Sequence, residues 1–267
     1  MKMVIRVAIA GPRGKMGQNA VHTVMRDDKM ELVAVFDYKN IAPNLAQYQE
    51  FDATYSVPVF SSIQTLFETV QADVFVDLTV PEAGFIHTKA ALFAGVRPVV
   101  GTTGFTESQL QELRYLSESA GIGCIIAPNF SIGAVLMMKF AQMAASYFPD
   151  AEIIEMHHDG KLDAPSGTAL KTAQMIKENR MAHRQGAEAE RETLEGARGA
   201  DFDGMRIHSV RLPGLVAHQQ VLFGGTGELL TIRHDSFDRN SFMTGLTLSI
   251  EKVLELNQFV YGLENIL

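Results

Sequence analysis

Residues 157–168 combine side chains that can exchange protons with a turn that can bind an anion. Two histidines, His157 and His158, come first, Lys161 follows, and a Ser-Gly-Thr sequence closes the stretch at residues 166–168. A histidine exchanges a proton near neutral pH, and a lysine beside an anionic substrate can serve as a proton donor. The combination predicts protonation of a small anionic substrate.

The Ser-Gly-Thr sequence is expected at the start of a helix. Residues 151–156 have the apolar pattern of a short strand, and residues 169–176 carry small and apolar residues on one helical face. The first turn of a helix offers unpaired N–H groups and a positive dipole end, so Ser166, Gly167 and Thr168 can bind a carboxylate. A simpler interpretation is that Ser166 only caps the helix, but a cap requires neither two imidazoles nor a lysine.

A second chemical signal lies near the start of the chain, where residues 11–17 read GPRGKMG after an apolar run at 3–10. A helix is expected at 18–25 and a strand at 31–36, which ends beside Asp37. Strand, glycine turn, helix, strand and acid in this order are typical of a dinucleotide-binding unit. The spacing G-x-x-G-x-x-G is not the commoner G-x-G-x-x-G, so the glycines predict this site only together with the strands and the acid.

The residues around Asp37 leave the cofactor open between NADH and NADPH. Asp37 is expected to accept hydrogen bonds from the adenosine ribose and to repel a 2′-phosphate, which favours NADH. Arg13 and Lys39, however, could reach such a phosphate, and Tyr38 could stack on the adenine.

The alternation of strands and helices continues to about residue 130, which predicts a parallel sheet. The strands are expected at 73–78, 97–100 and 123–127, with helices at 82–94 and 107–119. The turns at 101–104 and 128–131 would then lie at the carboxyl edge of the sheet, where ligands bind in open α/β folds. A plain strand-to-helix turn is the alternative for residues 101–104.

The second half of the chain has a different pattern. A helix at 132–147 and the polar segment 178–204, expected to be a solvated helix end and an exposed loop, flank the histidine-containing stretch. Strands separated by short turns follow at 206–212, 218–223 and 229–234, which predicts an antiparallel or mixed sheet and a second domain. A last helix at 242–256 is expected to pack back on the first domain.

These patterns predict an α/β fold with two domains. The first is a Rossmann-like, parallel-sheet dinucleotide-binding domain at residues 1–129, completed by 241–267. The second is an α+β domain with a mixed sheet at residues 130–240, for substrate binding and oligomerisation.

Composition limits the classes of partner. A net charge of −8 over 267 residues argues against nucleic acid or an anionic membrane as a general partner. No apolar run reaches the ~18 residues of a membrane span, and no secretory cleavage pattern is found, so a cytoplasmic protein is expected. The single cysteine, Cys124, rules out an internal disulfide and a multi-cysteine metal site, and no metal is expected.

Four motifs together resemble the 4-hydroxy-tetrahydrodipicolinate reductase (dihydrodipicolinate reductase) family, NAD(P)H enzymes of bacterial lysine and diaminopimelate synthesis. They lie at residues 11–17, 101–105, 127–131 and 157–168. The resemblance spans nearly the whole chain. The glycine turn is generic, whereas the sequence from Glu155 to Thr168 is very specific to that family.

The resemblance implies hydride transfer to C4 of a cyclic dicarboxylate after loss of water, with His157 or Lys161 as the catalytic proton donor. It implies that His158, Gly167 and Thr168 contact the substrate. The dinucleotide contacts that it implies are Gly11, Pro12, Arg13, Gly14, Lys15, Met16, Asp37, Gly101, Thr102, Thr103, Ala127, Pro128, Asn129 and Phe130.

The resemblance also implies a homotetramer built through the second domain's sheet and hinges near Asn129 and Arg239. Some family members carry an arginine after the acidic residue that suits NADPH, whereas this chain has Tyr38 and then Lys39. Which of His157 and Lys161 delivers the proton, and whether the substrate is bound hydrated or dehydrated, stays open.

Two other functions fit parts of the pattern. The first is a different Rossmann oxidoreductase, such as a sugar or semialdehyde dehydrogenase. A semialdehyde dehydrogenase that acts through a thioester needs an accessible cysteine, whereas Cys124 lies in an expected buried strand. A dinucleotide-sensing protein is the other, but a sensor has no need of the proton donors His157 and Lys161.

Overall fold

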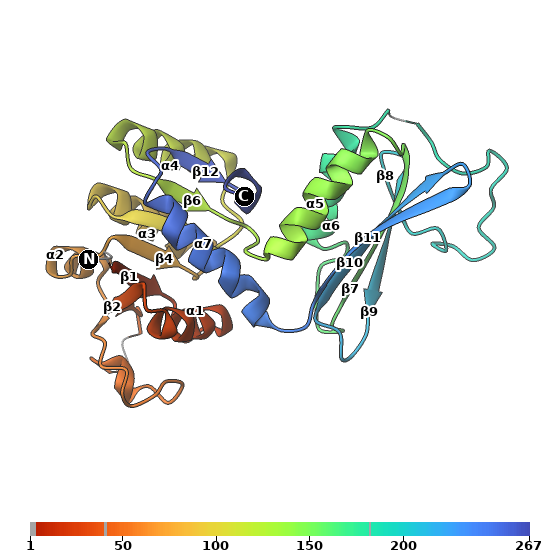
Figure 1. Cartoon of the computed structure of the whole chain (residues 1–267). Helices are drawn as coiled ribbons and strands as arrows, with labels where there is room; N and C mark the ends of the chain where they lie inside the picture. Colours follow the sequence, from red (N-terminus) through yellow and green to blue (C-terminus); the bar gives the residue numbers. More distant parts are fainter. Residues whose placement is uncertain (1–3, 40–41, 182) are drawn as a thin grey trace. The chain divides into compact units, whose positions relative to one another are not determined.

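A computed structural model describes residues 4–39, 42–181 and 183–267 of the chain. The strand predicted at 3–10 therefore begins with a residue that lies outside the described part. The chain forms two compact units, one made of Met1–Ser131 and Phe242–Leu267 and the other of Ile132–Ser241 (Figure 1). The sequence placed the corresponding boundaries after residues 129 and 240.

The first unit is built on a seven-stranded sheet in the order β12-β6-β5-β4-β1-β2-β3, in which every pair of neighbours is parallel. The strands are β1 (Ile5–Ala10), β2 (Met30–Phe36), β3 (Val59–Phe60), β4 (Val74–Asp77), β5 (Arg97–Val100), β6 (Cys124–Ile126) and β12 (Phe259–Tyr261). The helices are α1 (Lys15–Arg26), α2 (Ile63–Thr69), α3 (Pro81–Phe93), α4 (Glu107–Ala120) and α7 (Met243–Val253). The predicted Rossmann-like parallel sheet is confirmed.

The central strands are mostly apolar because helices cover both of their faces. Residues 7–10 of β1 and 74–77 of β4 are all fully buried, as expected for a doubly covered parallel sheet. From β1 the chain first builds β2 and β3 on one side and then crosses to β4 on the other, so the carboxyl ends of β1 and β4 form the topological switch point. Helix α7 packs on β4 and β5, which confirms that the C-terminal helix returns to the first unit.

The second unit is a five-stranded mixed sheet in the order β11-β10-β7-β9-β8, with β7 and β9 parallel and the other pairs antiparallel. Its strands are β7 (Asp150–His157), β8 (Ala200–Phe202), β9 (Met205–Arg211), β10 (Ala217–Gly225) and β11 (Glu228–Ser236). Helices α5 (Ile132–Ala145) and α6 (Gly167–Lys177) cover one face (Figure 1). The predicted mixed sheet is confirmed.

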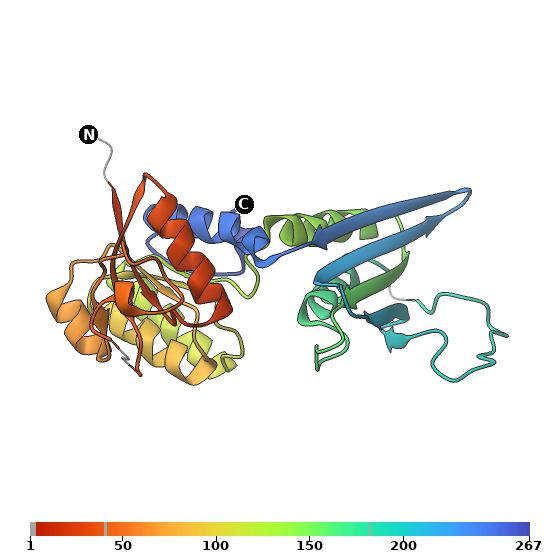
Figure 2. The ribbon, with the colours of Figure 1, turned by 90° about the horizontal axis from the view of Figure 1, so that it is seen from below.

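Small side chains bring the two helices close to this sheet. Alanines of α5 and α6 pack on Ile153, Val221 and Phe223, which are fully buried, and these residues form the core of the unit. In Figure 2 the long β10–β11 hairpin and the open segment after α6 extend from this core.

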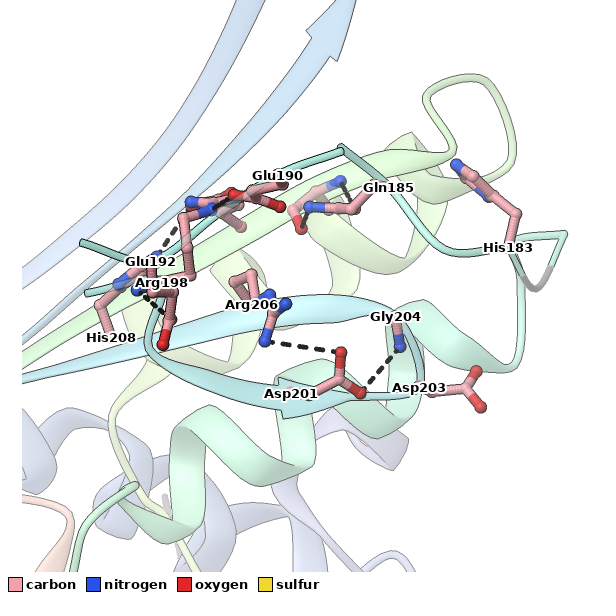
Figure 3. A network of polar contacts seen from close by, with 12 residues as sticks. His183, Gln185, Glu190, Glu192, Arg198, Asp201, Asp203, Gly204, Arg206 and His208 are labelled. Carbon is pink, nitrogen blue, oxygen red and sulfur yellow. Dashed lines mark hydrogen bonds and ion pairs between the residues drawn. The ribbon is translucent and has the colours of Figure 1, made fainter. Parts of the chain in front are cut away.

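The prediction that residues 178–204 form only a solvated helix end and loop is wrong in part. Arg180 is 8% exposed, and its guanidinium donates to the carbonyl oxygens of Pro149 and Asp203. Residues 200–202 form β8, which pairs with β9. Arg198 bonds Glu152 on β7 and Glu190, which fastens the segment to the sheet (Figure 3). Polar composition signalled exposure here, but the carbonyl groups that hold Arg180 cannot be read from composition.

Candidate active site

The predicted loop leaves the end of β7 and enters the first turn of α6. Ser166 is 3% exposed and its Oγ accepts the N–H of Ala169 at 3.2 Å, so Ser166 is the N-cap of the helix. Gly167, the first residue of α6, is exposed, and a Cβ added there would meet no atom within 4 Å. The start of α6 is therefore both capped from within and open to an approaching anion.

Beneath this turn lies the carboxylate of Glu155, which is fully buried on β7. Arg211 on β9 donates Nη2 to Oε1 at 2.7 Å and Nη1 to Oε2 at 2.9 Å, a bidentate pair. His157 Nδ1 lies 2.5 Å from Oε2. These contacts follow from strand register, because Glu155 is opposite Ser209 and His157 opposite Arg211 on the helix-covered face.

Burial and neighbouring charged groups act in opposite directions on the pKa values of Glu155 and His157. Burial raises the pKa of Glu155, but hydrogen bonds from Arg211, Ser209 and His157 outweigh it and leave that pKa below its usual value. Burial lowers the pKa of His157, and the neighbouring Glu155 offsets this only in part. Glu155 is therefore an anion, and His157 is a neutral imidazole near pH 7.

Lys161 lies in the same cluster. Its Nζ is 2.6 Å from Asp163 Oδ1, and its positive charge contributes to the lowered pKa of His157. Arg211 Nη2 also donates to the carbonyl oxygen of Asp163 at 2.8 Å. The structure thus brings together His157, Lys161 and the start of α6, which the sequence had placed in one functional loop.

In the first unit, the glycine turn lies between the end of β1 and the start of α1. Gly11 has φ +81°, and a Cβ at Gly17 would come within 1.9 Å of the Gly11 carbonyl oxygen, so only glycine fits at position 17. Gly14 is the N-cap of α1 and has no side-chain cap hydrogen bond. The first turn of α1 therefore has no side-chain cap, and its backbone packs closely against the glycine turn. Both features suit a pyrophosphate bound at the helix N-terminus.

Asp37 follows β2 and is 4% exposed. The guanidinium of Arg13 bonds both of its oxygens, with Nε to Oδ2 at 2.6 Å and Nη2 to Oδ1 at 2.9 Å, and Tyr48 donates its hydroxyl to Oδ2 at 3.1 Å. Although burial raises the pKa of Asp37, these bonds hold it below its usual value. Arg13 and Asp37 were expected to make separate contacts with the cofactor, and their ion pair was not predicted.

The turn at residues 101–104 is organised by a residue that sequence reasoning missed. Asp77, fully buried at the end of β4, accepts from Thr102 Oγ1 at 2.9 Å and from the backbone N–H and the hydroxyl of Thr79. His87 on α3 lies with Nδ1 2.7 Å from its other oxygen. The only signal in the sequence was a charged residue inside an apolar strand.

The last predicted cofactor segment, residues 127–130, follows β6. Ala127 and Phe130 are buried, while Pro128 is exposed. The ring of Phe130 packs beside Gly101, where an added Cβ would come within 2.7 Å of it. The structure therefore places the segments 101–104 and 127–130 side by side at the carboxyl edge of the sheet.

Two observations concern a cysteine-dependent dehydrogenase and a membrane-spanning protein. Cys124 is fully buried and burial raises the pKa of its thiol, which argues against a cysteine nucleophile. Among the described residues, no helix has the length and apolar character needed to cross a bilayer.

Comparison with known proteins shows the family of the chain. Residues 5–130 match the family model "Dihydrodipicolinate reductase, N-terminus" and residues 133–267 match "Dihydrodipicolinate reductase, C-terminus". The 4-hydroxy-tetrahydrodipicolinate reductases of Lysinibacillus sphaericus and Geobacillus kaustophilus are 65% and 60% identical, each over 99% of this chain and 100% of the relative.

Solved structures agree as well. A dipicolinate-bound dihydrodipicolinate reductase from Paenisporosarcina sp. TG-14 superposes with a TM-score of 0.92 at 64% identity, covering 99% of this chain and 100% of that one. A probable dehydrogenase from Thermotoga maritima, at 11% identity and a TM-score of 0.66 over 98% of this chain and 92% of its own, shares the fold alone. The chain therefore belongs to the 4-hydroxy-tetrahydrodipicolinate reductase family, oxidoreductases of lysine biosynthesis.

Proposed function

We propose that this chain reduces 4-hydroxy-tetrahydrodipicolinate to tetrahydrodipicolinate, with loss of water, using NADH or NADPH and the residues described below. The activity is that of its family. The observation that carries the residue assignment is the buried Glu155–His157 pair, which lies with Lys161 at the open N-terminus of α6.

The first unit has a backbone suited to a dinucleotide. The close approach of Gly17 to Gly11 and the uncapped start of α1 leave room and N–H groups for a pyrophosphate. We assign cofactor contacts to residues 11–16, to Asp37, and to the turns 101–103 and 127–130. When bound, the reduced nicotinamide supplies the hydride that adds to C4 of the conjugated imine formed from the substrate by loss of water.

In the second unit, we assign the substrate's carboxylates to the start of α6. Ser166, Gly167 and Thr168 present the helix N-terminus to one carboxylate, and His158 lies on the same loop. The related enzyme from Paenisporosarcina binds dipicolinate, a planar ring with two carboxylates, and this ligand supports a cyclic dicarboxylate as the substrate of the present chain.

The reduced ring must gain a proton after hydride addition. Lys161 Nζ is an N–H donor, and His157 can deliver a proton from Nε2 when it is an imidazolium. The Lys161–Asp163 ion pair keeps the ammonium near His157. We assign the proton transfer to these two residues as a pair.

Cofactor choice depends on Arg13. In the structure Arg13 neutralises Asp37, so the carboxylate alone does not repel a 2′-phosphate. We propose that Arg13 turns toward a 2′-phosphate when NADPH binds and stays on Asp37 when NADH binds, so that both cofactors are accepted. Arg13→Ala should then lower kcat/KM with NADPH about 10-fold more than with NADH, which corresponds to the loss of one charge-assisted contact.

A homotetramer is also proposed. One face of the five-stranded sheet is covered by α5 and α6, and the other carries partly exposed apolar side chains on its inner strands, including Ile154, Met156, Val210 and Leu222. A second copy of the chain is the partner that such a face fits. Light scattering on the purified chain should give four times the mass of one chain, and a monomer would contradict this.

The function is tested by a coupled assay. The substrate is made in situ from pyruvate and aspartate semialdehyde by the preceding synthase, and nicotinamide absorbance is followed with NADH and NADPH side by side. Rapid oxidation that depends on the synthase is the expected result. Folded protein that binds either cofactor but oxidises neither would contradict the proposal.

A further inference from the structure

The carboxylate of Glu155 connects three parts of the second unit. It receives His157 from its own strand and the bidentate guanidinium of Arg211 from β9. Its Oε1 also accepts the backbone N–H of Ser166 at 3.3 Å. One buried anion is therefore bonded both to the acid–base histidine and to the cap of the helix assigned to the substrate carboxylate.

We propose that Glu155, held by Arg211, is a positioning residue for the reduction, which fixes His157 with a proton on Nδ1 and leaves Nε2 as the nitrogen that exchanges protons. This inference rests on the acid–base role proposed above for His157. Because Glu155 also holds the N–H of Ser166, it ties the position of that histidine to the start of α6.

The direction of the His157–Glu155 hydrogen bond follows from the charge of the acceptor. An ionised carboxylate only accepts, so Nδ1 must donate and the neutral ring carries its lone pair on Nε2. Arg211 keeps Glu155 ionised in spite of its burial. The charged groups that act on His157 are Glu155, Lys161 and Arg211, and Glu155 alone favours the imidazolium.

A purely structural role for Glu155 would affect folding but not the protonation of His157. The chain offers a matched control on the same strand. Glu152 accepts from Arg198 Nη2 at 2.6 Å and lies 2.8 Å from His208 Nε2, so it also has an arginine and a histidine as partners (Figure 3). Arg198 belongs to the segment after α6 and His208 to β9, and neither lies in the loop at residues 157–168.

The test compares Glu155→Gln with Glu152→Gln in the coupled assay. Glutamine keeps the shape of the side chain and removes its charge. For Glu155→Gln we expect kcat to fall about 10- to 100-fold, near the lower end of what a positioned acid–base group contributes. The limb of the kcat profile that follows the His157 imidazolium should move to lower pH, because the adjacent negative charge is lost. Glu152→Gln should change neither.

A double-mutant cycle separates this inference from the proposed function. If Glu155 acts through His157, adding Glu155→Gln to His157→Gln should cost no further activity. Full kcat in His157→Gln alone would overturn the proposed role of the histidine. An impaired His157→Gln in which Glu155→Gln causes the same loss as in the wild type would overturn only the inference.

A measurement on the unmodified chain covers the case in which Glu155→Gln does not fold. The ¹⁵N chemical shifts of His157, assigned by difference from the His157→Gln spectrum, report which ring nitrogen is protonated. We expect a neutral ring protonated on Nδ1 above the pKa. A ring protonated on Nε2 would overturn the inference.

Discussion

Strand β7 carries two glutamates with the same kinds of partner and different surroundings. Glu155 faces the helices, is fully buried and binds Arg211 and His157. Glu152 faces the other side of the sheet, has a side chain that is 26% exposed, and binds Arg198 and His208. Two glutamates within four residues of one strand thus each have a guanidinium and an imidazole as partners.

The two clusters differ in which histidine nitrogen is not bonded to the glutamate and in what surrounds that nitrogen. His157 engages Glu155 through Nδ1, which leaves Nε2, and the loop beyond it leads to Lys161 and the start of α6. His208 engages Glu152 through Nε2, and its Nδ1 packs against Gly199, where an added Cβ would come within 2.8 Å. Residue types alone therefore do not identify a site. The burial of the glutamate and the position of the second histidine nitrogen distinguish the two clusters.

The largest expected effect concerns Lys161, the lysine of the loop beside the Glu155 cluster. Lys161→Met should lower kcat by about 10²- to 10⁴-fold, because it removes a proton donor from the loop, while cofactor affinity stays nearly unchanged. Lys177→Met is the control, since Lys177 pairs with Asp203 at 3.3 Å outside the site. Coupled kinetics and NADH titration measure both, and an equal loss of turnover and cofactor affinity in Lys161→Met would contradict its assigned role.

The two histidines give the next effect. His157→Gln should reduce kcat by about 10²-fold, and His208→Gln should leave it within about 2-fold, because only the first has a nitrogen available to the substrate. Steady-state kinetics at saturating substrate measure the contrast. Similar losses in both variants would mean that the two clusters are not functionally distinct.

Stability should separate the two arginines. Arg211→Ala leaves the buried anion of Glu155 without its main partner, which costs about 3–5 kcal/mol. Arg198→Ala breaks contacts that are about a quarter to a third exposed within a single chain, and solvent screening limits their contribution within that chain to about 1 kcal/mol. The free energy of unfolding in urea measures both, and equal costs would break the comparison.

The smallest effect is on acid stability. The pKa of Glu152 is lowered, since hydrogen bonds from Arg198 and His208 outweigh the burial that raises it. A carboxylate with a lowered folded-state pKa stabilises the fold above its ordinary pKa of 4.5, and this stability is lost as the pH falls toward the lower value. Glu152→Gln should therefore lose less unfolding free energy than the wild type between about pH 5 and pH 3. An unchanged pH dependence would contradict the sign.

Local sequence patterns predicted most of the fold. The strand at residues 97–100 was predicted with its observed ends, and helices α1 and α3–α7 were predicted from their helical spacing, whereas the short helix α2 (Ile63–Thr69) was missed. The two-residue strand β3 and the three-residue strands β8 and β12 were not predicted, whereas the equally short β6 was, because it lies in a longer apolar run at residues 123–127. They exist through pairing with β2, β9 and β6.

The candidate site was predictable only where its residues are close together in the sequence. His157, Lys161 and the 166–168 turn form one local signal. Arg211 joins Glu155 across 56 positions, and Thr102 joins Asp77 across 25, so neither contact could be seen without the strand register. The sequence therefore grouped the residues that are proposed to react and missed the contacts that hold them.

A titration with dipicolinate tests the central claim, that the cluster around Glu155 is the chemical one and the cluster around Glu152 is structural. The ¹⁵N-labelled chain, with NADH present, is titrated and the backbone amide shifts are followed. We expect the largest changes at residues 155–168, above all at Gly167 and Thr168, and small changes at residues 190–208. Changes centred on Arg198 and His208, with residues 157–168 unaffected, would contradict the account.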